Sequence, residues 1–564
     1  MLDVRLVAVA DLSAAAPVVL ALPTAPAAEP DAAEPGADGP GPLVEADAAD
    51  EAPGPVAVTD AEIAEATAEY ADTAEDADAA EDGDVAERSE PATLLPTGYS
   101  LPDSLRATLD AWLGDERRPE PPAKGKAGEI ATLPLPGGAP ALVLLVGVGE
   151  GSEADWRKAG AALVRAASGD PEVVLALPSD ATPDAVRGLF EGALLASYRF
   201  TLASDPKPQT LTTVTVVTDD PTQFSDAVAR AEAVARGTAF ARDLVNTPSN
   251  IKSPEWFAAQ AVERATALGI DAQVRDPEWL AANDFGGMLA VGGGSTRGPR
   301  LLELRWAPQG VELHTLRHIV LVGKGITFDT GGISIKPAQG MQLMKKDMGG
   351  GAAVVGAVLA AAAQQLPLRV TVLVPLAENM PSGTAQRPSD VVVMRNGTSV
   401  EILDTDAEGR MVLGDGLCLA SEKHPDWVVD IATLTGAQVV ALGTDIAGVM
   451  ANDDAFRSRV VDAAGAAGEG AWPMPLPVEL RAKLDTPTAD IAHKGDRDGG
   501  MLTAGLFLKE FVGEGIRWAH LDIAGPAFND APPHGYTPKG GTGHAVRTLV
   551  RLAEDLAAGD VPEA

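Results

Sequence analysis

Three carboxylates and a guanidinium lie within the stretch Asp404-Thr405-Asp406-Ala407-Glu408-Gly409-Arg410. Like charges at this spacing repel and raise one another's pKa unless a cation lies among them. An Asp-x-Glu pair in a loop can direct two hard oxygen ligands at one ion, which suits Zn²⁺, Mn²⁺ or Mg²⁺. A solvated acidic turn would have the same composition, so this stretch alone leaves both interpretations open.

A second stretch favours the metal interpretation. Residues 323–350 supply two more isolated carboxylates, Asp329 and Asp347, and two lysines, Lys324 and Lys336, among many glycines. Together with the first stretch this makes four carboxylates of the metal-binding type, two lysines and an arginine. Such a set is sufficient for a hydrolase that uses two metal ions.

Three blocks of sequence resemble the signature segments of the leucyl aminopeptidase family, the cytosolic dimetal aminopeptidases. They are VGKGITFDTGGISIKP at 322–337, KKDMGG at 345–350 and DTDAEGR at 404–410. The resemblance extends from about residue 241 to about residue 541 and is weak before it. One departure stands out, because the family's usual Asn-Thr-Asp reads Asp404-Thr405-Asp406 here.

The resemblance implies two divalent metal ions, with Mn²⁺ or Zn²⁺ expected. One ion would lie among Asp329, Asp406 and Glu408. The other would share Asp329 and Glu408 as bridging ligands and add Lys324 and Asp347. Lys324 would have to bind as the neutral amine, and a nearby cation together with desolvation lowers a lysine pKa in that direction. Two such ions activate the water between them as a nucleophile.

The resemblance also implies roles for Lys336 and Arg410. The Lys336 ammonium would stabilise the tetrahedral oxyanion. The Arg410 guanidinium would hold a bicarbonate ion that acts as general base. From the residues alone, Arg410 could instead pair with Asp404 or Asp406. The extra carboxylate of Asp404 could compete for Arg410, tighten a metal or do neither.

The seven histidines all fall outside these blocks, which argues against a histidine-type zinc protease. His520 lies in a predicted strand, and we expect it to be a packed core residue. His493 stands beside Lys494, and we expect it on the surface or in a loop.

Two further segments, 432–436 and 522–527, resemble the family's substrate pocket. In the family a metal binds the free amino group, so only the first residue of a peptide is removed. Small apolar walls favour Leu, Met or a similar first side chain, although the same residues could be ordinary core positions. The predicted pocket residues are Met344, Thr433, Leu434, Gly436, Ala524 and Ala527.

The predicted function is therefore an aminopeptidase that releases N-terminal amino acids, Leu above all, from short peptides. A Cys-Gly dipeptidase or an amino-acid-amide hydrolase could use the same machinery. A DNA-binding homologue and an inactive scaffold are alternatives of a different class. The family's homohexamers, with active sites facing an interior cavity, are carried over as an implication of the resemblance.

Alternating strand and helix patterns predict an α/β fold that positions these residues at strand ends and helix starts. We expect a smaller N-terminal α/β domain over 1–220, with 24–95 as a disordered acidic insertion. A linking helix and linker over 221–252 would lead to the catalytic domain over 253–564, with a mixed central sheet flanked by helices. Ser253 and Pro254 predict the start of a helix there.

The formal net charge of −38 is unevenly distributed over the 564 residues. Between Glu29 and Glu90 there are 21 acidic residues and one basic residue, Arg88. Such acidity makes nucleic acid and anionic membranes unfavourable partners. The single cysteine, Cys418, excludes internal disulfides. Residues 1–28 contain interrupting aspartates, which favours a cytoplasmic enzyme over a secreted one.

Overall fold

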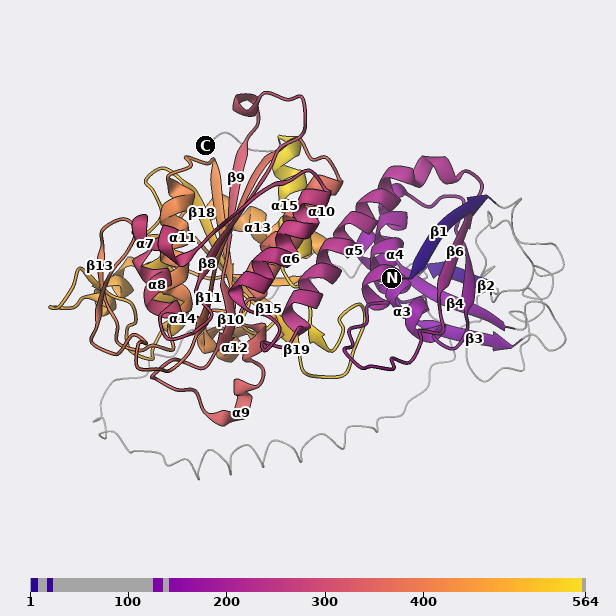
Figure 1. Ribbon diagram of the computed structural model, residues 1–564. Coiled ribbons are helices and arrows are strands. Elements are labelled where there is room, and N and C mark those ends of the chain that lie inside the picture. The colour runs from indigo at the N-terminus through magenta and orange to yellow at the C-terminus, as the bar shows by residue number, and fades with distance from the viewer. Residues whose placement is uncertain (1, 9–17, 24–124, 135–141, 560–564) are drawn as a thin grey trace, which may run out of the picture. The chain divides into compact units, whose positions relative to one another are not determined.

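The computed structural model describes residues 2–8, 18–23, 125–134 and 142–559 (Figure 1). The predicted acidic insertion over 24–95 lies outside these residues. The described chain is organised around a smaller and a larger β-sheet, and helices pack against both. This confirms the predicted α/β class with a smaller N-terminal and a larger catalytic domain.

The smaller sheet has six strands: β1 (Asp3–Ala8), β2 (Val18–Pro23), β3 (Ile130–Pro134), β4 (Leu142–Gly149), β5 (Glu172–Ala176) and β6 (Thr213–Thr218). Their order is β1-β6-β5-β2-β4-β3. All neighbours are parallel except β3, which runs antiparallel to β4. Strands buried on both faces are near-continuous apolar runs, as the sequence of β4 is. The helices of this region are α3 (Glu153–Ala166) and α4 (Pro183–Ala196).

Helix α5 (Ser225–Asn246), which follows the 3₁₀ turn η2 (Pro221–Phe224), contributes to the cores of both sheets. Ala231 and Ala235 belong to the apolar cluster of the smaller sheet. Val234 and Phe240 belong to the cluster beneath the larger sheet. Because one helix has apolar side chains on both of these faces, it packs in both regions.

The first helix after α5 is α6 (Pro254–Ala267), where the Ser253 hydroxyl accepts a hydrogen bond from Trp256 N, as predicted for an N-cap. The strands of the larger sheet are β7 (Asp271–Arg275), β8 (Arg300–Trp306), β9 (His318–Gly323), β10 (Gly325–Asp329), β11 (Arg369–Asn379), β14 (Trp427–Ala432), β15 (Ile446–Ala451), β16 (Gly470–Pro473) and β18 (Arg517–Asp522). Two small sheets contain β12 (Val391–Val393), β13 (Ser399–Glu401) and β17 (Ile491–Ala492), and β19 (Phe528–Asn529) and β20 (Gly540–Gly541).

The larger sheet is mixed, as expected. Its order is β16-β15-β18-β14-β9-β11-β8-β7, and β10 also pairs with β11. The central strands β18, β14, β9 and β11 are parallel, whereas β15 and β8 run antiparallel to their neighbours β18 and β11. Parallel strands end at the same edge of a sheet, so the segments that follow them meet there.

Helices cover both faces of this sheet (Figure 1). Along β9, Ile319 and Leu321 point into one apolar layer, and Val320 and Val322 into the other. This alternation is the period-two pattern of a buried strand. The helices are α7 (Pro277–Ala282), α8 (Gly286–Gly292), α9 (Ala338–Met341), α10 (Gly349–Ala363), α11 (Gly409–Ser421), α12 (Gly436–Leu442), α13 (Asp454–Ala467), α14 (Gly500–Lys509) and α15 (Val546–Ala558), with 3₁₀ turns η3 (Leu313–Thr315), η4 (Met344–Lys346) and η5 (Val478–Leu484).

Helix α10 is the central helix of the larger core. Within the described residues, the helical stretch 338–363 is long and apolar enough to cross a membrane. However, 89% of its apolar 18-residue segment is buried inside the protein. Its composition is therefore explained by burial in the core.

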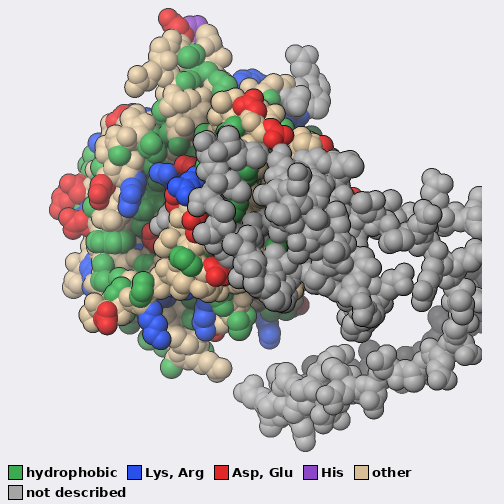
Figure 2. All heavy atoms as spheres, turned by 90° about the vertical axis from the view of Figure 1, so that its right-hand side faces the viewer, with side chains coloured by type: hydrophobic (Ala, Val, Ile, Leu, Met, Phe, Trp, Pro, Cys, Tyr) green, Lys and Arg blue, Asp and Glu red, His purple; other side chains and the backbone are tan. Residues whose placement is uncertain are grey.

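On the face drawn in Figure 2, acidic, basic and hydrophobic side chains are interspersed.

The first turn of α10 lies against β14 with no room for a side chain. A Cβ atom added at Gly350 would lie 1.9 Å from the carbonyl oxygen of Ile431. We expect Gly350→Ala to lower the free energy of unfolding by about 1–3 kcal/mol, because the helix would have to move off the strand. Urea unfolding measures this change.

The matched control is Gly465→Ala in α13, where no atom lies within 4 Å of an added Cβ. Alanine is the better helix former, so this variant should be as stable as the parent or slightly more stable. Equal destabilisation by both substitutions would contradict the close-packing explanation.

Candidate active site

The larger sheet delivers the first two predicted ligands at its edge. Lys324 follows the last residue of β9, and Asp329 is the last residue of β10. The Lys324 backbone is held on both sides, since its N–H donates to Ile431 O at 3.0 Å and its carbonyl accepts from Gly351 N at 2.8 Å. The side chain reaches the carbonyl oxygen of Thr433, the residue that follows β14, at 3.0 Å.

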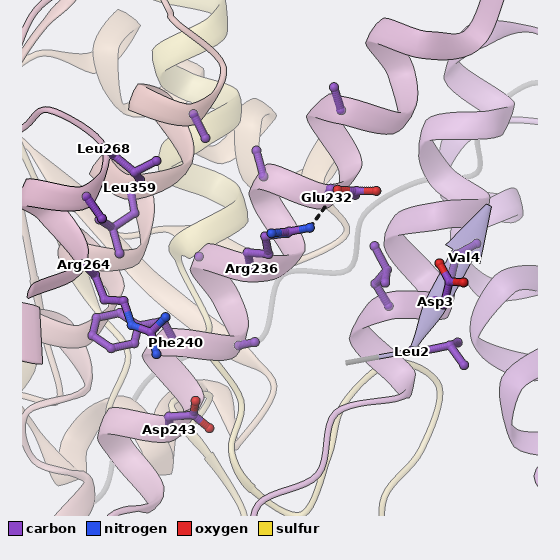
Figure 3. A pocket seen from close by; sticks show the side chains of 17 residues that line it. Leu2, Asp3, Val4, Glu232, Arg236, Phe240, Asp243, Arg264, Leu268 and Leu359 are labelled. Atoms are coloured by element: carbon purple, nitrogen blue, oxygen red, sulfur yellow. Dashed lines mark hydrogen bonds and ion pairs between the residues drawn. The ribbon is translucent and has the colours of Figure 1, made fainter. Parts of the chain in front are cut away.

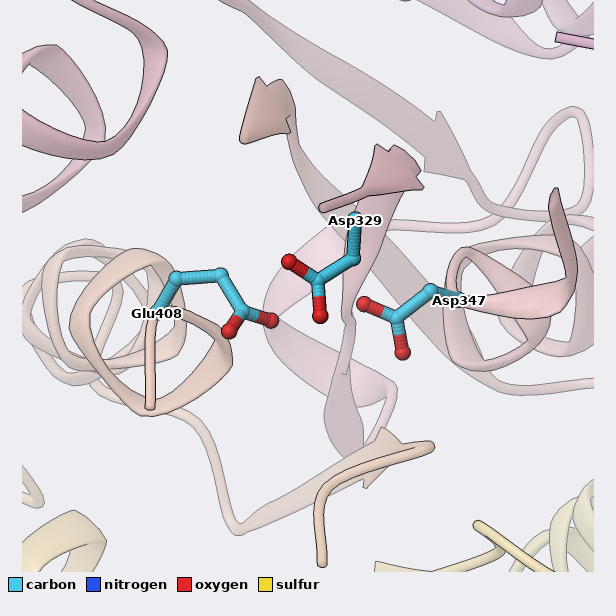
Figure 4. A group of neighbouring side chains, drawn as sticks. All are labelled: Asp329, Asp347 and Glu408. Atoms are coloured by element: carbon cyan, nitrogen blue, oxygen red, sulfur yellow. The ribbon is translucent and has the colours of Figure 1, made fainter. Parts of the chain in front are cut away.

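Asp347 and Glu408 reach the same place from helix starts. Asp347 lies between η4 and α10, and Glu408 is the residue before α11. The carboxylates of Asp329, Asp347 and Glu408 have oxygen atoms within 4.8 Å of one another, and all three side chains are buried. Figure 4 shows these three carboxylates directed at a common region.

Two lysines neutralise this cluster. Lys324 Nζ lies 2.9 Å from Asp347 Oδ2 and 2.8 Å from Glu408 Oε1. Lys336 Nζ lies 2.8 Å from Asp329 Oδ2 and also contacts Asp406 Oδ1. All of the predicted ligands and Lys336 are therefore brought together.

The electrostatics fit a cation site. Burial and the charge of Glu408 raise the pKa of Asp329 to about 6, and burial raises the pKa of Asp347 well above its ordinary value. Burial alone would lower the pKa of Lys324, but Asp347, Glu408 and Asp329 raise it above its ordinary value. Beside these carboxylates the Lys324 amine keeps its proton, and coordination of a metal would require it to lose that proton.

The oxygen atoms retain the capacity to bind an ion. Asp347 Oδ2, Asp406 Oδ1 and Glu408 Oε1 are buried and accept no hydrogen bond of regular geometry from the described residues, although each faces a lysine ammonium. Carboxylate oxygens in this state are the donors that hard divalent ions prefer. The residues present therefore fit the predicted metal ions.

Arg410 is buried at the start of α11. Its Nη1 donates to the carbonyl oxygen of His493 at 2.8 Å, and its Nε has no hydrogen-bond partner in the described part of the chain. Burial lowers its pKa to about 10, so the guanidinium remains charged at neutral pH. An unpartnered, buried guanidinium N–H is suited to a small anion.

The extra carboxylate of Asp404 is neutralised by a different residue from those considered in the sequence. Asp404 Oδ2 pairs with Lys494, and Asp404 Oδ1 accepts a hydrogen bond from Asp406 N at 3.0 Å. Asp404 therefore buttresses the Asp406 backbone and leaves Arg410 directed toward His493.

His493 lies in a loop, which is one of the two places expected for it, but it is not on the surface. It is 1% exposed, and its Nε2 lies 2.7 Å from the carbonyl oxygen of Asp404. Burial and the neighbouring Arg410 lower its pKa to about 4. Sequence position alone could not place it, because the loop that carries it folds back against residues 401–404. His520 is buried, as predicted, and its Nδ1 lies 2.5 Å from Asp430 Oδ1.

Sequence reasoning missed Asn379. Its Nδ2 donates to Asp329 Oδ1 at 2.8 Å and to Thr405 O at 3.0 Å, so it joins the two ligand-bearing loops. Asp329 and Asn379 are opposite each other in the β10–β11 pair. A polar residue that ends a long apolar strand was the available signal.

The predicted pocket residues divide into two groups. Thr433 Oγ1 donates to Asp347 Oδ1 at 2.8 Å, and a Cβ built on Gly349 would lie 3.4 Å from Thr433 Cγ2 and 3.3 Å from Ala527 Cβ. Thr433 therefore contacts the carboxylate cluster, and Ala527 lies beside Gly349, two residues after Asp347. Gly436 is exposed at the start of α12, Ala524 is buried, and Met344 and Leu434 are half-buried.

A large cavity lies elsewhere. An open pocket of about 830 Å³ lies between the start of β1 and helices α4, α5, α6 and α10. Figure 3 shows side chains that line it. Its charged lining includes Arg236 and Glu232, which pair with each other at 3.0 Å. None of the predicted site residues lines it. We therefore locate the active site from the converging side chains, not from cavity size.

Comparison with known proteins agrees with this geometry. Residues 239–550 match the catalytic-domain model of the cytosol aminopeptidase family, and residues 120–204 match the model of its N-terminal domain. The chain belongs to the cytosol aminopeptidase family. It is a metal-dependent aminopeptidase, a hydrolase of a dimetal family, as the sequence predicted.

Relatives in the cytosol aminopeptidase family cover most of the chain. A probable cytosol aminopeptidase of Streptomyces avermitilis is 52% identical over 461 residues, which is 78% of this chain and 88% of the relative. One from Nocardia farcinica is 46% identical over 469 residues, with coverage of 82% and 91%. The solved structure described as "Bottromycin maturation enzyme BotP in complex with Mn" is 40% identical, with a TM-score of 0.71, and covers 77% of this chain and 95% of its own. The Cys-Gly dipeptidase and DNA-binding alternatives gain no support from these matches.

Replacing Asp404 with the residue usual in the family tests its buttressing role. Asp404→Asn retains an oxygen that can accept from Asp406 N and loses only a partly exposed ion pair. We therefore expect kcat/KM to stay within about threefold of the parent. Asp404→Ala removes the acceptor as well and should lower kcat/KM further. Equal activity of the Ala variant in steady-state assays would show that the hydrogen bond to Asp406 is dispensable.

Proposed function

We propose that this cytosol aminopeptidase removes the first residue of short peptides, with a preference for Leu and similar side chains. The observation that carries the proposal is the convergence of Asp329, Asp347 and Glu408 around Lys324. Buried like charges need cations among them. The oxygen-rich donor set favours divalent ions, with Mn²⁺ or Zn²⁺ as our choice.

We propose the following division of ligands between two ions. One ion would be held by Asp329, Asp406 and Glu408, and the other by Lys324, Asp329, Asp347 and Glu408. When bound, the ions would supply Lewis-acid polarisation of the peptide carbonyl and lower the pKa of a water molecule. The manganese in the description of the BotP structure supports Mn²⁺ as one of the candidates.

Lys336 and Arg410 complete the proposed chemistry. The Lys336 ammonium already lies beside Asp329 and Asp406, where it can stabilise negative charge that develops on the substrate oxygen. The Arg410 Nε has no hydrogen-bond partner among the described residues, which supports a small anion such as bicarbonate beside it. In that position the anion would accept the proton of the attacking water.

The first side chain of the substrate would lie against the segments 432–436 and 522–527. Thr433 donates a hydrogen bond to Asp347, and Ala527 lies beside Gly349, two residues further along the chain. An apolar pocket next to charged ligands is the usual form of a small-molecule site. The full proposed set is Met344, Thr433, Leu434, Gly436, Ala524 and Ala527.

Glu408→Gln tests the proposed centre, since it preserves shape and removes one bridging charge. Metal-stripped protein would be re-supplied with Mn²⁺, Zn²⁺, Co²⁺ or Mg²⁺ and assayed on leucine p-nitroanilide. We expect kcat/KM to fall by at least about 100-fold, because even indirect partners of metal ligands cost 10–100-fold. Calorimetric titration should show fewer than two ions per chain.

The control for this experiment is Glu422→Gln, which changes an exposed glutamate just beyond α11 that pairs with Arg395. It should retain the parent activity and metal content. Metal-dependent activity retained by Glu408→Gln would refute the proposed ligand set. An inactive parent with every ion would refute the Leu-type preference.

We also propose a homohexamer in the cytoplasm, following the family resemblance and the relatives described as cytosol aminopeptidases. Val440, Trp472 and Val478 are exposed apolar side chains whose burial between subunits would be favourable. Sedimentation should give a species six times the 57.7 kDa mass of one chain. A monomer at micromolar concentration would contradict the proposal.

A further inference from the structure

One buried carboxylate joins the two proposed pocket segments. Strands β14 and β18 are parallel neighbours, and Ala432 is opposite Asp522, the last residue of β18. The segments 433–436 and 523–527 therefore leave the sheet side by side. Asp522 is 0% exposed and lies at the root of both.

The Asp522 carboxylate makes four contacts with these segments. Oδ1 accepts hydrogen bonds from Leu434 N at 3.1 Å, Thr435 N at 3.4 Å and Ala524 N at 3.2 Å. Oδ2 accepts a hydrogen bond from Thr435 Oγ1 at 2.6 Å. Both oxygens are thus used to hold three backbone amides and a hydroxyl from two loops. The two oxygens of a carboxylate offer enough acceptor sites for this arrangement.

Gln438 makes a second link between the same loops. Its backbone N–H donates to Thr435 Oγ1 at 3.1 Å, and its Oε1 accepts from Gly525 N at 2.7 Å. The Thr435 hydroxyl consequently donates to Asp522 while it accepts from Gln438. The two pocket segments form one hydrogen-bonded unit whose central acceptor is Asp522.

This unit is tied directly to the carboxylate cluster. Thr433, the residue before Leu434, accepts from Lys324 Nζ through its carbonyl oxygen at 3.0 Å. Its hydroxyl donates to Asp347 Oδ1 at 2.8 Å. A displacement of the 433–436 loop would therefore change both the pocket wall and the surroundings of two proposed ligands.

We propose that Asp522 is a positioning residue that sets substrate preference by fixing both pocket walls relative to the metal ligands. This rests on the proposed function. The physical reason is that an apolar pocket distinguishes side chains by fit, with about 10–200-fold discrimination per methylene group. If the two loops were released from Asp522, the enzyme would lose discrimination between substrate side chains before it lost the ability to hydrolyse them.

The test compares Asp522→Asn and Asp522→Ala with a matched control, Asp415→Asn. Asp415 is also 0% exposed, and it accepts backbone hydrogen bonds from Met288 at 2.9 Å and Arg395 at 3.0 Å. It thus joins two separate segments by the same physical means, but neither segment contains a proposed pocket residue. Any general effect of losing a buried carboxylate should be common to the three variants.

We expect the ratio of kcat/KM for leucine over alanine p-nitroanilide to fall by at least about tenfold in Asp522→Ala. The loss should come mainly from a higher KM for the leucine substrate. Asp522→Asn keeps one acceptor oxygen and should show a smaller fall. Asp415→Asn should keep the parent ratio. An unchanged ratio in a folded Asp522→Ala variant would overturn the proposal.

Hydrogen exchange gives a readout that does not need activity. Peptides covering 433–436 and 523–527 should exchange faster in Asp522→Ala than in the parent, while Asp415→Asn leaves them protected. If the parent hydrolyses neither substrate, the proposed function fails, but selective loss of protection in both segments still supports the positioning role. Equal protection of these segments in Asp522→Ala and Asp415→Asn would overturn that role.

Discussion

The arrangement of the catalytic region depends on keeping several carboxylates ionised inside the protein. Asp329, Asp347 and Glu408 are nearly inaccessible to water, and their mutual repulsion and desolvation would be prohibitive without positive charge. Lys324 and Lys336 supply that charge from two loops of the same strand-turn segment. The site is consequently a balanced cluster of charges, and a divalent ion held there would replace a lysine contact and a proton.

The sheet topology makes this balance possible. β9, β14 and β18 are parallel and end at one edge, so Lys324, Thr433 and Asp522 are neighbours although they are far apart in sequence. The close approach of α10 to β14 then brings Asp347 within reach of Thr433. The contacts that orient the proposed metal-binding residues also fix the strand ends. Open α/β sheets commonly bind small molecules at such strand ends.

At position 404, where the family usually has Asn, the additional negative charge of Asp is neutralised by a residue distant in the sequence. Asp404 would have added an uncompensated charge beside Arg410. Instead, the loop that carries His493 and Lys494 packs against Asp404. Lys494 neutralises the Asp404 carboxylate, and His493 contacts the Asp404 carbonyl oxygen. Among the described residues, the Arg410 Nε thereby has no hydrogen-bond partner. A partner some 90 residues away could not be identified from the motif itself.

The amino-acid sequence by itself determined the fold class, the family resemblance and the set of candidate ligands, because apolar periodicity and short motifs are local properties. It also indicated the start of α6 from Ser253 and Pro254. Only the tertiary structure decided which groups meet: the burial of His493, the pairing of Asp404 with Lys494, and the links made by Asn379 and Asp522. These depend on strand register and loop packing, which join residues distant in the chain and leave no fixed spacing in the sequence.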